Sequence, residues 1–237
     1  MLPLWRHRLL VVRPDVWPGI CADTLKAPGN EAIRPVVSGW GERGWPLICR
    51  RPFQSELKEL AAGGVAVGLP LPPAMGKQRL SFIVPCSALS AFSGKLWPDQ
   101  TTSAPGITSA RQEDISALLA LGARHNIQPE ATGSLLWETL TGLAYLSETS
   151  DFDVVWRLSH LEAENPDALR AFLHDLSKTA CKLSVRLDGE IIFPDYRAVQ
   201  WQELITADPD DEVLVKTLFS VALMPLRSLT DVRENMT

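Results

Sequence analysis

Residues 150–155 read Ser-Asp-Phe-Asp-Val-Val, so that two aspartates flank a single phenylalanine. Because side chains alternate between the two faces of a β-strand, Asp151 and Asp153 project to one face and Phe152 to the other. Two carboxylates held side by side in a desolvated site repel each other unless a cation lies between them. Mg²⁺ meets this need with one or two protein carboxylates, completed by phosphate oxygens and water. The stretch therefore predicts a strand that carries a divalent-metal site.

A glycine–serine pair precedes this strand in the chain. Gly133 and Ser134 open the run Gly-Ser-Leu-Leu-Trp, and helix-compatible sequence separates them from Asp151. Glycine lets backbone amides approach a phosphate closely, and the serine hydroxyl adds a further donor. Two metal ions beside such a phosphate site activate an attacking hydroxyl and neutralise a leaving pyrophosphate. Each motif alone is common, but the two in this order indicate nucleotidyl-type transfer.

The first hundred residues have a different pattern from the rest. They are dense in Pro, Gly and Trp, with short apolar runs that predict the strands of a small irregular sheet. The expected strands are Leu9–Val12, Pro46–Cys49, Val65–Leu69 and Leu80–Val84, with a core supplied by Trp5, Trp17, Trp40, Trp45 and Trp97. Residues 98–107 are polar and turn-rich, as in a linker. We expect a β-rich N-terminal domain over residues 1–100 that binds substrate or carrier, and a catalytic domain over residues 108–237.

The second domain alternates helical and extended patterns. Ser109 and Gln112 resemble a capping box, which predicts a helix to about His125. Asn165 followed by Pro166 predicts a second helix that ends near Cys181. Extended runs are expected at Phe152–Leu158, Leu183–Leu187, Glu190–Phe193, Ala198–Trp201 and Val213–Lys216. The whole chain is therefore predicted to be α+β, with a mixed-sheet α/β domain behind the β-rich one.

Composition narrows the class of protein. Hydrophobic residues make up 46% and charged residues 22% of 237 residues, as in soluble globular proteins. The net charge of −5 argues against wrapping a nucleic acid, and no apolar run approaches the length that spans a bilayer. We expect a cytoplasmic protein without nucleic-acid or membrane partners. The four cysteines are spread singly, which indicates thiols rather than disulfides or zinc.

A Gly-Ser pair, a helix and then Asp-x-Asp on the next strand resemble the signature of the DNA polymerase β-like nucleotidyltransferase superfamily. Longer blocks resemble one family in particular, the phosphoribosyl-dephospho-CoA transferases of malonate decarboxylase, also called holo-acyl-carrier-protein synthases. The blocks are the runs at residues 133–156, 186–204 and 213–223, and in the N-terminal half those at 6–10, 44–52 and 65–85. The likeness covers nearly the whole chain.

The resemblance implies an enzyme that takes phosphoribosyl-dephospho-CoA from triphosphoribosyl-dephospho-CoA and attaches it to a serine of the acyl carrier subunit of malonate decarboxylase. Pyrophosphate is then the leaving group, and Mg²⁺ or Mn²⁺ the cofactor. The family's Gly-Ser falls on Gly133 and Ser134, and its paired metal-binding, catalytic carboxylates fall on Asp151 and Asp153.

Superfamily members usually place a third metal carboxylate on a later strand, which points to Asp188 or Glu190. Asp188-Gly189 between two extended runs is equally a hairpin signal, so Asp188 is either a turn residue or a metal ligand. Lys216 lies in an otherwise apolar strand, where burial is costly without an anion. We expect it to contact either a substrate phosphate or a carboxylate of the site.

Basic residues of the N-terminal half are candidates for binding the triphosphate, since guanidinium groups suit phosphate oxygens. They are Arg50, Arg51, Lys77 and Arg79, and solvated surface charge is the alternative for each. Two other functions stay open at this point. One is a nucleotidyltransferase that uses ATP to modify a small molecule or a protein. The other is a non-catalytic assembly module for a carrier-protein complex.

Overall fold

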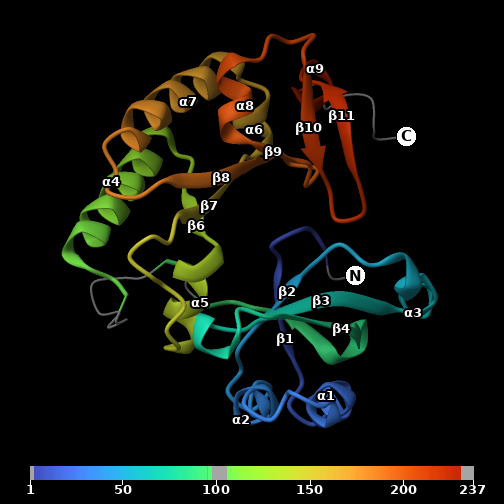
Figure 1. Cartoon of the computed structure of the whole chain (residues 1–237). Coiled ribbons are helices and arrows are strands. Elements are labelled where there is room, and N and C mark those ends of the chain that lie inside the picture. Colours follow the sequence, from blue (N-terminus) through green and yellow to red (C-terminus); the bar gives the residue numbers. More distant parts are fainter. Residues whose placement is uncertain (1–2, 95, 98–105, 231–237) are drawn as a thin grey trace. The chain divides into compact units, whose positions relative to one another are not determined.

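The structure is a computed structural model that describes residues 3–94, 96–97 and 106–230 (Figure 1). The chain forms two compact units, one made of Met1–Lys95 with Leu143–Tyr145 and the other of Leu96–Gly142 with Leu146–Thr237. Helices and sheets occur in both, which confirms the predicted α+β class. Residues 98–105 of the expected linker lie outside the described residues.

The first unit contains a five-stranded antiparallel sheet with the order β4-β3-β2-β1-β5. Its strands are β1 (Leu9–Val12), β2 (Leu47–Cys49), β3 (Gly64–Pro70), β4 (Arg79–Pro85) and β5 (Leu89–Ala91). The four predicted strands are confirmed within one or two residues, and β5 was not predicted. The sheet is also more regular than its Pro- and Gly-rich sequence indicates.

Helices that the sequence did not predict complete this unit. They are α1 (Trp17–Lys26), α2 (Arg34–Ser38) and α3 (Leu57–Ala61), with single 3₁₀ turns η1 (Gln54–Glu56), η2 (Pro73–Met75) and η3 (Cys86–Ala88). Proline occupies the first turn of both α1 and α2, where its missing N–H costs no hydrogen bond. Both prolines therefore lie where they favour the start of a helix.

Tryptophans form much of the core of the first unit. Trp17 lies edge-on to Phe82 of β4 at 5.1 Å between ring centroids, and its indole N–H donates to the Val37 carbonyl at 2.6 Å. Trp40 and Trp5 are also buried, whereas Trp45 is half-buried. Trp97 does not belong to this core, because it is half-buried and falls in the second unit.

The second unit contains a six-stranded mixed sheet with the order β11-β10-β9-β8-β7-β6. Its strands are β6 (Pro129–Ala131), β7 (Phe152–Arg157), β8 (Leu187–Ile192), β9 (Ala198–Gln200), β10 (Glu212–Lys216) and β11 (Val221–Pro225). β7 and β8 run parallel, and every other neighbouring pair is antiparallel. The mixed sheet is therefore as predicted, while β6 and β11 were not foreseen.

The helices of this unit are α4 (Ser109–His125), α5 (Gly133–Thr141), α6 (His160–Ala163), α7 (Pro166–Ala180), α8 (Trp201–Thr206) and α9 (Arg227–Thr230). Asn165 caps α7 as predicted, accepting from the Ala168 amide at 3.1 Å. The predicted cap of α4 was wrong by one residue. Thr108, not Ser109, is the N-cap, and its hydroxyl accepts from the Arg111 amide at 3.3 Å.

The two faces of the mixed sheet differ. Along β7, Phe152, Val154 and Trp156 point to one face, and Trp156 meets Phe172 of α7 at 6.0 Å between ring centroids. α4 and α7 lie together on one side of the sheet (Figure 1). Asp153 lies at an alternate position of β7, so its side chain projects to the other face, away from α7.

One strand and one turn were placed wrongly. The expected run Leu183–Leu187 is irregular up to Arg186, and β8 then continues without a break through Asp188 and Glu190. Asp188-Gly189 is therefore not a hairpin turn. A Cβ on Gly189 would lie 2.4 Å from the Val154 carbonyl oxygen, so this glycine is needed for the close approach of β8 to β7.

Within the described residues, no helix is long and apolar enough to cross a membrane.

Replacing Gly189 by alanine tests this packing. The added methyl would press on backbone of β7, so Gly189→Ala is expected to lower the free energy of unfolding by about 1–3 kcal/mol in urea titrations. Gly19 of α1 has open space around its would-be Cβ. Gly19→Ala should therefore leave stability unchanged or raise it slightly. Equal effects of the two substitutions would contradict the close strand approach.

Candidate functional site

The parallel pair β7–β8 brings two carboxylates together. Asp153 and Asp188 are direct partners in the register of this pair. Partners on neighbouring strands project to the same face, and the strands lie about 4.8 Å apart. Both side chains are half-buried. Of the two alternatives for Asp188, the structure therefore places it beside the aspartate motif rather than in a turn.

The N-terminus of α5 lies directly against Asp153. The Thr132 amide donates to the Asp153 carbonyl at 2.8 Å, which joins the start of α5 to β7. Gly133 follows with φ +55°, and a Cβ on it would lie 1.9 Å from Asp153 Oδ2. Only glycine leaves room for that carboxylate. Ser134 comes next in the first turn of α5 and is half-buried.

Asp151, just before β7, pairs with an arginine that the sequence did not single out. Arg186 Nε and Nη2 donate to Asp151 Oδ2 at 3.1 and 2.6 Å. The Phe152 amide donates to the Arg186 carbonyl at 2.9 Å, so the backbone holds the two residues side by side. The hydrogen bond to Asp151 raises the pKa of the Arg186 guanidinium, and the charges of Asp188 and Asp153 raise it further. The arginine therefore lies within the field of all three aspartates.

The next carboxylates along the sheet have partners of their own. The Gln200 amide donates to Asp188 Oδ1 at 2.5 Å. Glu190 is buried, and Lys216 Nζ donates to its Oε1 at 2.8 Å. Of the two anions expected for Lys216, the structure thus supplies a carboxylate. Glu190 shares a strand face with Asp188, as residues two apart must.

Two buried polar side chains of α4 hold the loops that enter β7 and β8. The Arg111 guanidinium donates to the carbonyls of Ser147 at 2.7 Å and Ser150 at 3.2 Å. The Asp114 carboxylate accepts from the Ser184 amide at 3.0 Å and from its hydroxyl at 2.5 Å. These bonds offset the cost of burying charge and fix the chain just before Asp151 and Arg186. They also lie on one helix, so the two loops share a single support.

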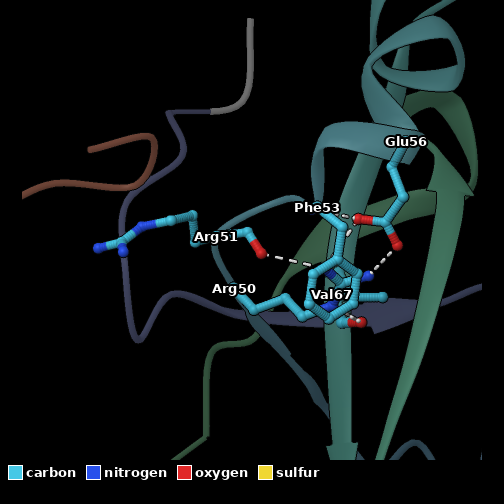
Figure 2. A network of polar contacts seen from close by, with 5 residues as sticks. All are labelled: Arg50, Arg51, Phe53, Glu56 and Val67. Carbon is cyan, nitrogen blue, oxygen red and sulfur yellow. Dashed lines mark hydrogen bonds and ion pairs between the residues drawn. The ribbon is translucent and has the colours of Figure 1, made fainter. Parts of the chain in front are cut away.

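The basic residues proposed to bind triphosphate belong to the first unit. Arg50 is engaged there (Figure 2): its Nη1 and Nη2 donate to the Glu56 carboxylate at 2.9 and 2.5 Å, and its Nε donates to the Val67 carbonyl at 3.1 Å. The Arg51 side chain points away from this network in Figure 2. Lys77 and Arg79 are exposed. Phosphate contact by these four residues stays a prediction.

Comparison with known proteins identifies the family. The model described as the phosphoribosyl-dephospho-CoA transferase MdcG N-terminal domain matches residues 5–94, and the one described as the MdcG C-terminal domain matches residues 100–227. The chain belongs to the phosphoribosyl-dephospho-CoA transferase family. It is therefore an enzyme, a transferase, as the sequence predicted.

Individual transferases of this family align over almost the whole chain. The phosphoribosyl-dephospho-CoA transferase of Xanthomonas euvesicatoria pv. vesicatoria is 33% identical over 229 residues, which cover 96% of this chain and 97% of that protein. The phosphoribosyl-dephospho-CoA transferase of Bradyrhizobium diazoefficiens is 31% identical, with 94% and 90% covered. No solved structure matches the chain.

The donor set of the site suits a hard divalent cation. Among the described residues, no group of three or more His, Cys, Asp or Glu side chains is arranged to hold a metal ion. Mg²⁺, however, takes as few as one or two protein carboxylates when phosphate oxygens complete its shell. Asp151 and Asp153 supply that number, Gly133 leaves space for Asp153, and a guanidinium already occupies Asp151 as a cation. The residues therefore fit Mg²⁺ or Mn²⁺.

Alanine at position 133 is expected to displace Asp153. Misplacement of a reacting group by about 1 Å costs on the order of a hundredfold in rate, so transferase activity of Gly133→Ala should fall by at least that factor. Gly142, at the other end of α5, has φ +70° and open space around its would-be Cβ. Gly142→Ala introduces similar backbone strain, about 1–2 kcal/mol in urea unfolding, without touching Asp153. Equal activity in the two variants would contradict the role of Gly133.

The Arg50–Glu56 pair should make stability depend on pH. The hydrogen bond from Arg50 lowers the pKa of Glu56. A lowered pKa in the folded state gives stability that is present above the unfolded value, about 4.3, and is lost as pH falls through the folded value. Glu56→Gln should cost about 1–3 kcal/mol in urea unfolding near pH 7 and much less near pH 3. Glu59→Gln, at an exposed site of α3, should show no such difference.

Proposed function

We propose that this transferase attaches phosphoribosyl-dephospho-CoA to a serine of the acyl carrier subunit of malonate decarboxylase. The donor is triphosphoribosyl-dephospho-CoA, and pyrophosphate leaves. The observation that carries the proposal is the meeting of Asp153, Asp188 and the Gly133 turn in a chain of the phosphoribosyl-dephospho-CoA transferase family.

The reaction is a substitution at phosphorus. The serine Oγ of the carrier forms a bond to the α-phosphorus of the donor, and the bond from that phosphorus to the bridging oxygen of the pyrophosphate breaks. The serine proton leaves, and the product is a phosphodiester. The enzyme therefore has to hold a polyphosphate in line with a hydroxyl and to neutralise charge on the leaving group.

The chain's own residues have distinct parts in this proposal. Gly133 and Ser134 hold the donor's phosphates through backbone amides and the serine hydroxyl at the start of α5. Asp151 and Asp153 would hold Mg²⁺ or Mn²⁺, which when bound polarises phosphate oxygens and lowers the pKa of the acceptor hydroxyl. Asp188 is assigned as the third carboxylate in preference to Glu190, since it lies beside Asp153 while Glu190 binds Lys216.

Intact-mass measurement tests the proposal directly. The carrier subunit, incubated with this protein, Mg²⁺ and triphosphoribosyl-dephospho-CoA, is expected to gain the mass of the phosphoribosyl-dephospho-CoA unit. Chelation of the metal should abolish the gain, and Mn²⁺ should restore it. Asp151→Asn and Asp153→Asn should each slow the reaction by at least about a hundredfold.

Asp195→Asn is the matched control, because Asp195 is exposed and pairs with Arg197 at the β8–β9 turn. It should leave the rate unchanged. A mass gain that persists without divalent metal would overturn the metal part of the proposal. A gain of AMP on a protein with ATP as donor, and none on this carrier, would instead favour a different nucleotidyl transfer.

A further inference from the structure

Arg186 is a positive group that lies against the aspartate motif, where its guanidinium donates two hydrogen bonds to a single oxygen of Asp151. It comes immediately before β8, one residue from Leu187 and two from Asp188. Its backbone is fixed by the bond from the Phe152 amide. The backbone of Arg186 is therefore held at the entrance to the β7–β8 pair, next to the strands that carry Asp153 and Asp188.

The charge balance of the site depends on this side chain. Asp151 and Asp153 are two residues apart, and like charges this close in the chain repel each other unless a cation lies near them. Arg186 supplies the cation in this structure, and an arginine stays protonated at any ordinary pH. It can leave Asp151 only by moving its side chain.

Exposure makes that movement easy. The Arg186 side chain is 73% exposed, against 34% for Asp151. An ion pair this accessible to water contributes little free energy, because solvent competes for both partners. A divalent cation held by two carboxylates therefore competes successfully for Asp151. The released guanidinium remains anchored beside the site, where it can form paired hydrogen bonds with phosphate oxygens.

We propose that Arg186 is an exchangeable counter-cation: it neutralises Asp151 before a divalent cation binds, and once displaced it binds the pyrophosphate portion of the donor. This inference rests on the proposed function, because it takes Asp151 and Asp153 as the carboxylates that hold the cation. It adds a substrate-positioning residue on the second unit that the aspartate motif alone does not reveal.

The first experiment measures binding of Mn²⁺ alone, by electron paramagnetic resonance of the free ion, with no donor or carrier present. Arg186→Gln removes the competing cation and should tighten Mn²⁺ binding by about two- to fivefold, the range expected for loss of an exposed ion pair. Arg186→Lys keeps the positive charge and should stay near the wild-type affinity. Arg227→Gln breaks another exposed pair of the same unit, with Asp210, and should have no effect.

The second experiment measures binding of inorganic pyrophosphate to the Mn²⁺-loaded protein by calorimetry. Arg186→Gln should weaken it by about tenfold or more, because a charge-assisted contact is lost. Arg186→Lys should weaken it less, and Arg227→Gln should leave it unchanged. The substitution thus moves the two affinities in opposite directions, which a general loss of structure would not do.

Asp153→Asn separates the two levels of inference. Loss of Mn²⁺ binding in Asp153→Asn, with wild-type affinities for both ligands in Arg186→Gln, would overturn the role of Arg186 and leave the metal site standing. Unchanged Mn²⁺ binding in Asp153→Asn would overturn the metal site itself. Weaker Mn²⁺ binding in Arg186→Gln would also contradict the exchange, since it would make the arginine a support of the site rather than a competitor.

Discussion

In the parallel pair of β7 and β8, Asp153 lies opposite Asp188, and a slip of one residue would turn one of these carboxylates toward the helix-covered face. Much of the second unit serves to hold this register. Gly189 lets the strands approach, since any side chain there would meet the backbone of Val154. Trp156 anchors the opposite face of β7 against Phe172 of α7. The chemistry on one face thus depends on tight apolar packing on the other.

The electrostatics of the carboxylate face follow from the same register. Three carboxylates of this region each accept a hydrogen bond from a side chain distant in sequence or on another strand. Arg186 donates to Asp151, Gln200 donates to Asp188, and Lys216 donates to Glu190. Beneath them, Arg111 and Asp114 of α4 bind the backbone at the entrances to both strands. Position and charge are therefore set by different residues, which allows the side chains at the surface to exchange partners while the backbone stays fixed.

Local patterns were enough to predict the strands with alternating or continuous apolar residues and the helix capped by Asn165. They also placed Asp153 on β7, although Asp151 lies just before that strand. They failed where the decisive neighbour is distant in sequence. Gly189 has the local chemistry of a turn, and only the carbonyl of Val154 shows that it serves strand packing. Helices α1 and α2 were missed because nothing near Pro18 and Pro35 distinguishes a turn from the start of a helix.

The site shows the same limit. Arg186 and Asp151 are 35 residues apart, and no spacing rule connects them. Arg111 and Asp114 have the composition of an exposed helix face, and their burial depends on loops that the sequence leaves undefined. Gly133 was expected to admit a phosphate, and the structure adds that it also admits Asp153. The missed residues are those whose role consists of a contact with a segment distant in the sequence.

The crossover between β7 and β8 has a consequence for the order of folding. Parallel neighbours cannot be joined by a tight turn, and here α6 and α7 fill the connection. Asp188 consequently reaches Asp153 only when this long connection closes, and no local contact can bring the two carboxylates together earlier. Closing a connection of this length is slow, because folding slows as contacts become less local. Closure brings like charges together, and the same closure brings Arg186, immediately before β8, against Asp151. The guanidinium at the entrance to β8 thereby offsets part of this repulsion, although water weakens its attraction to Asp151.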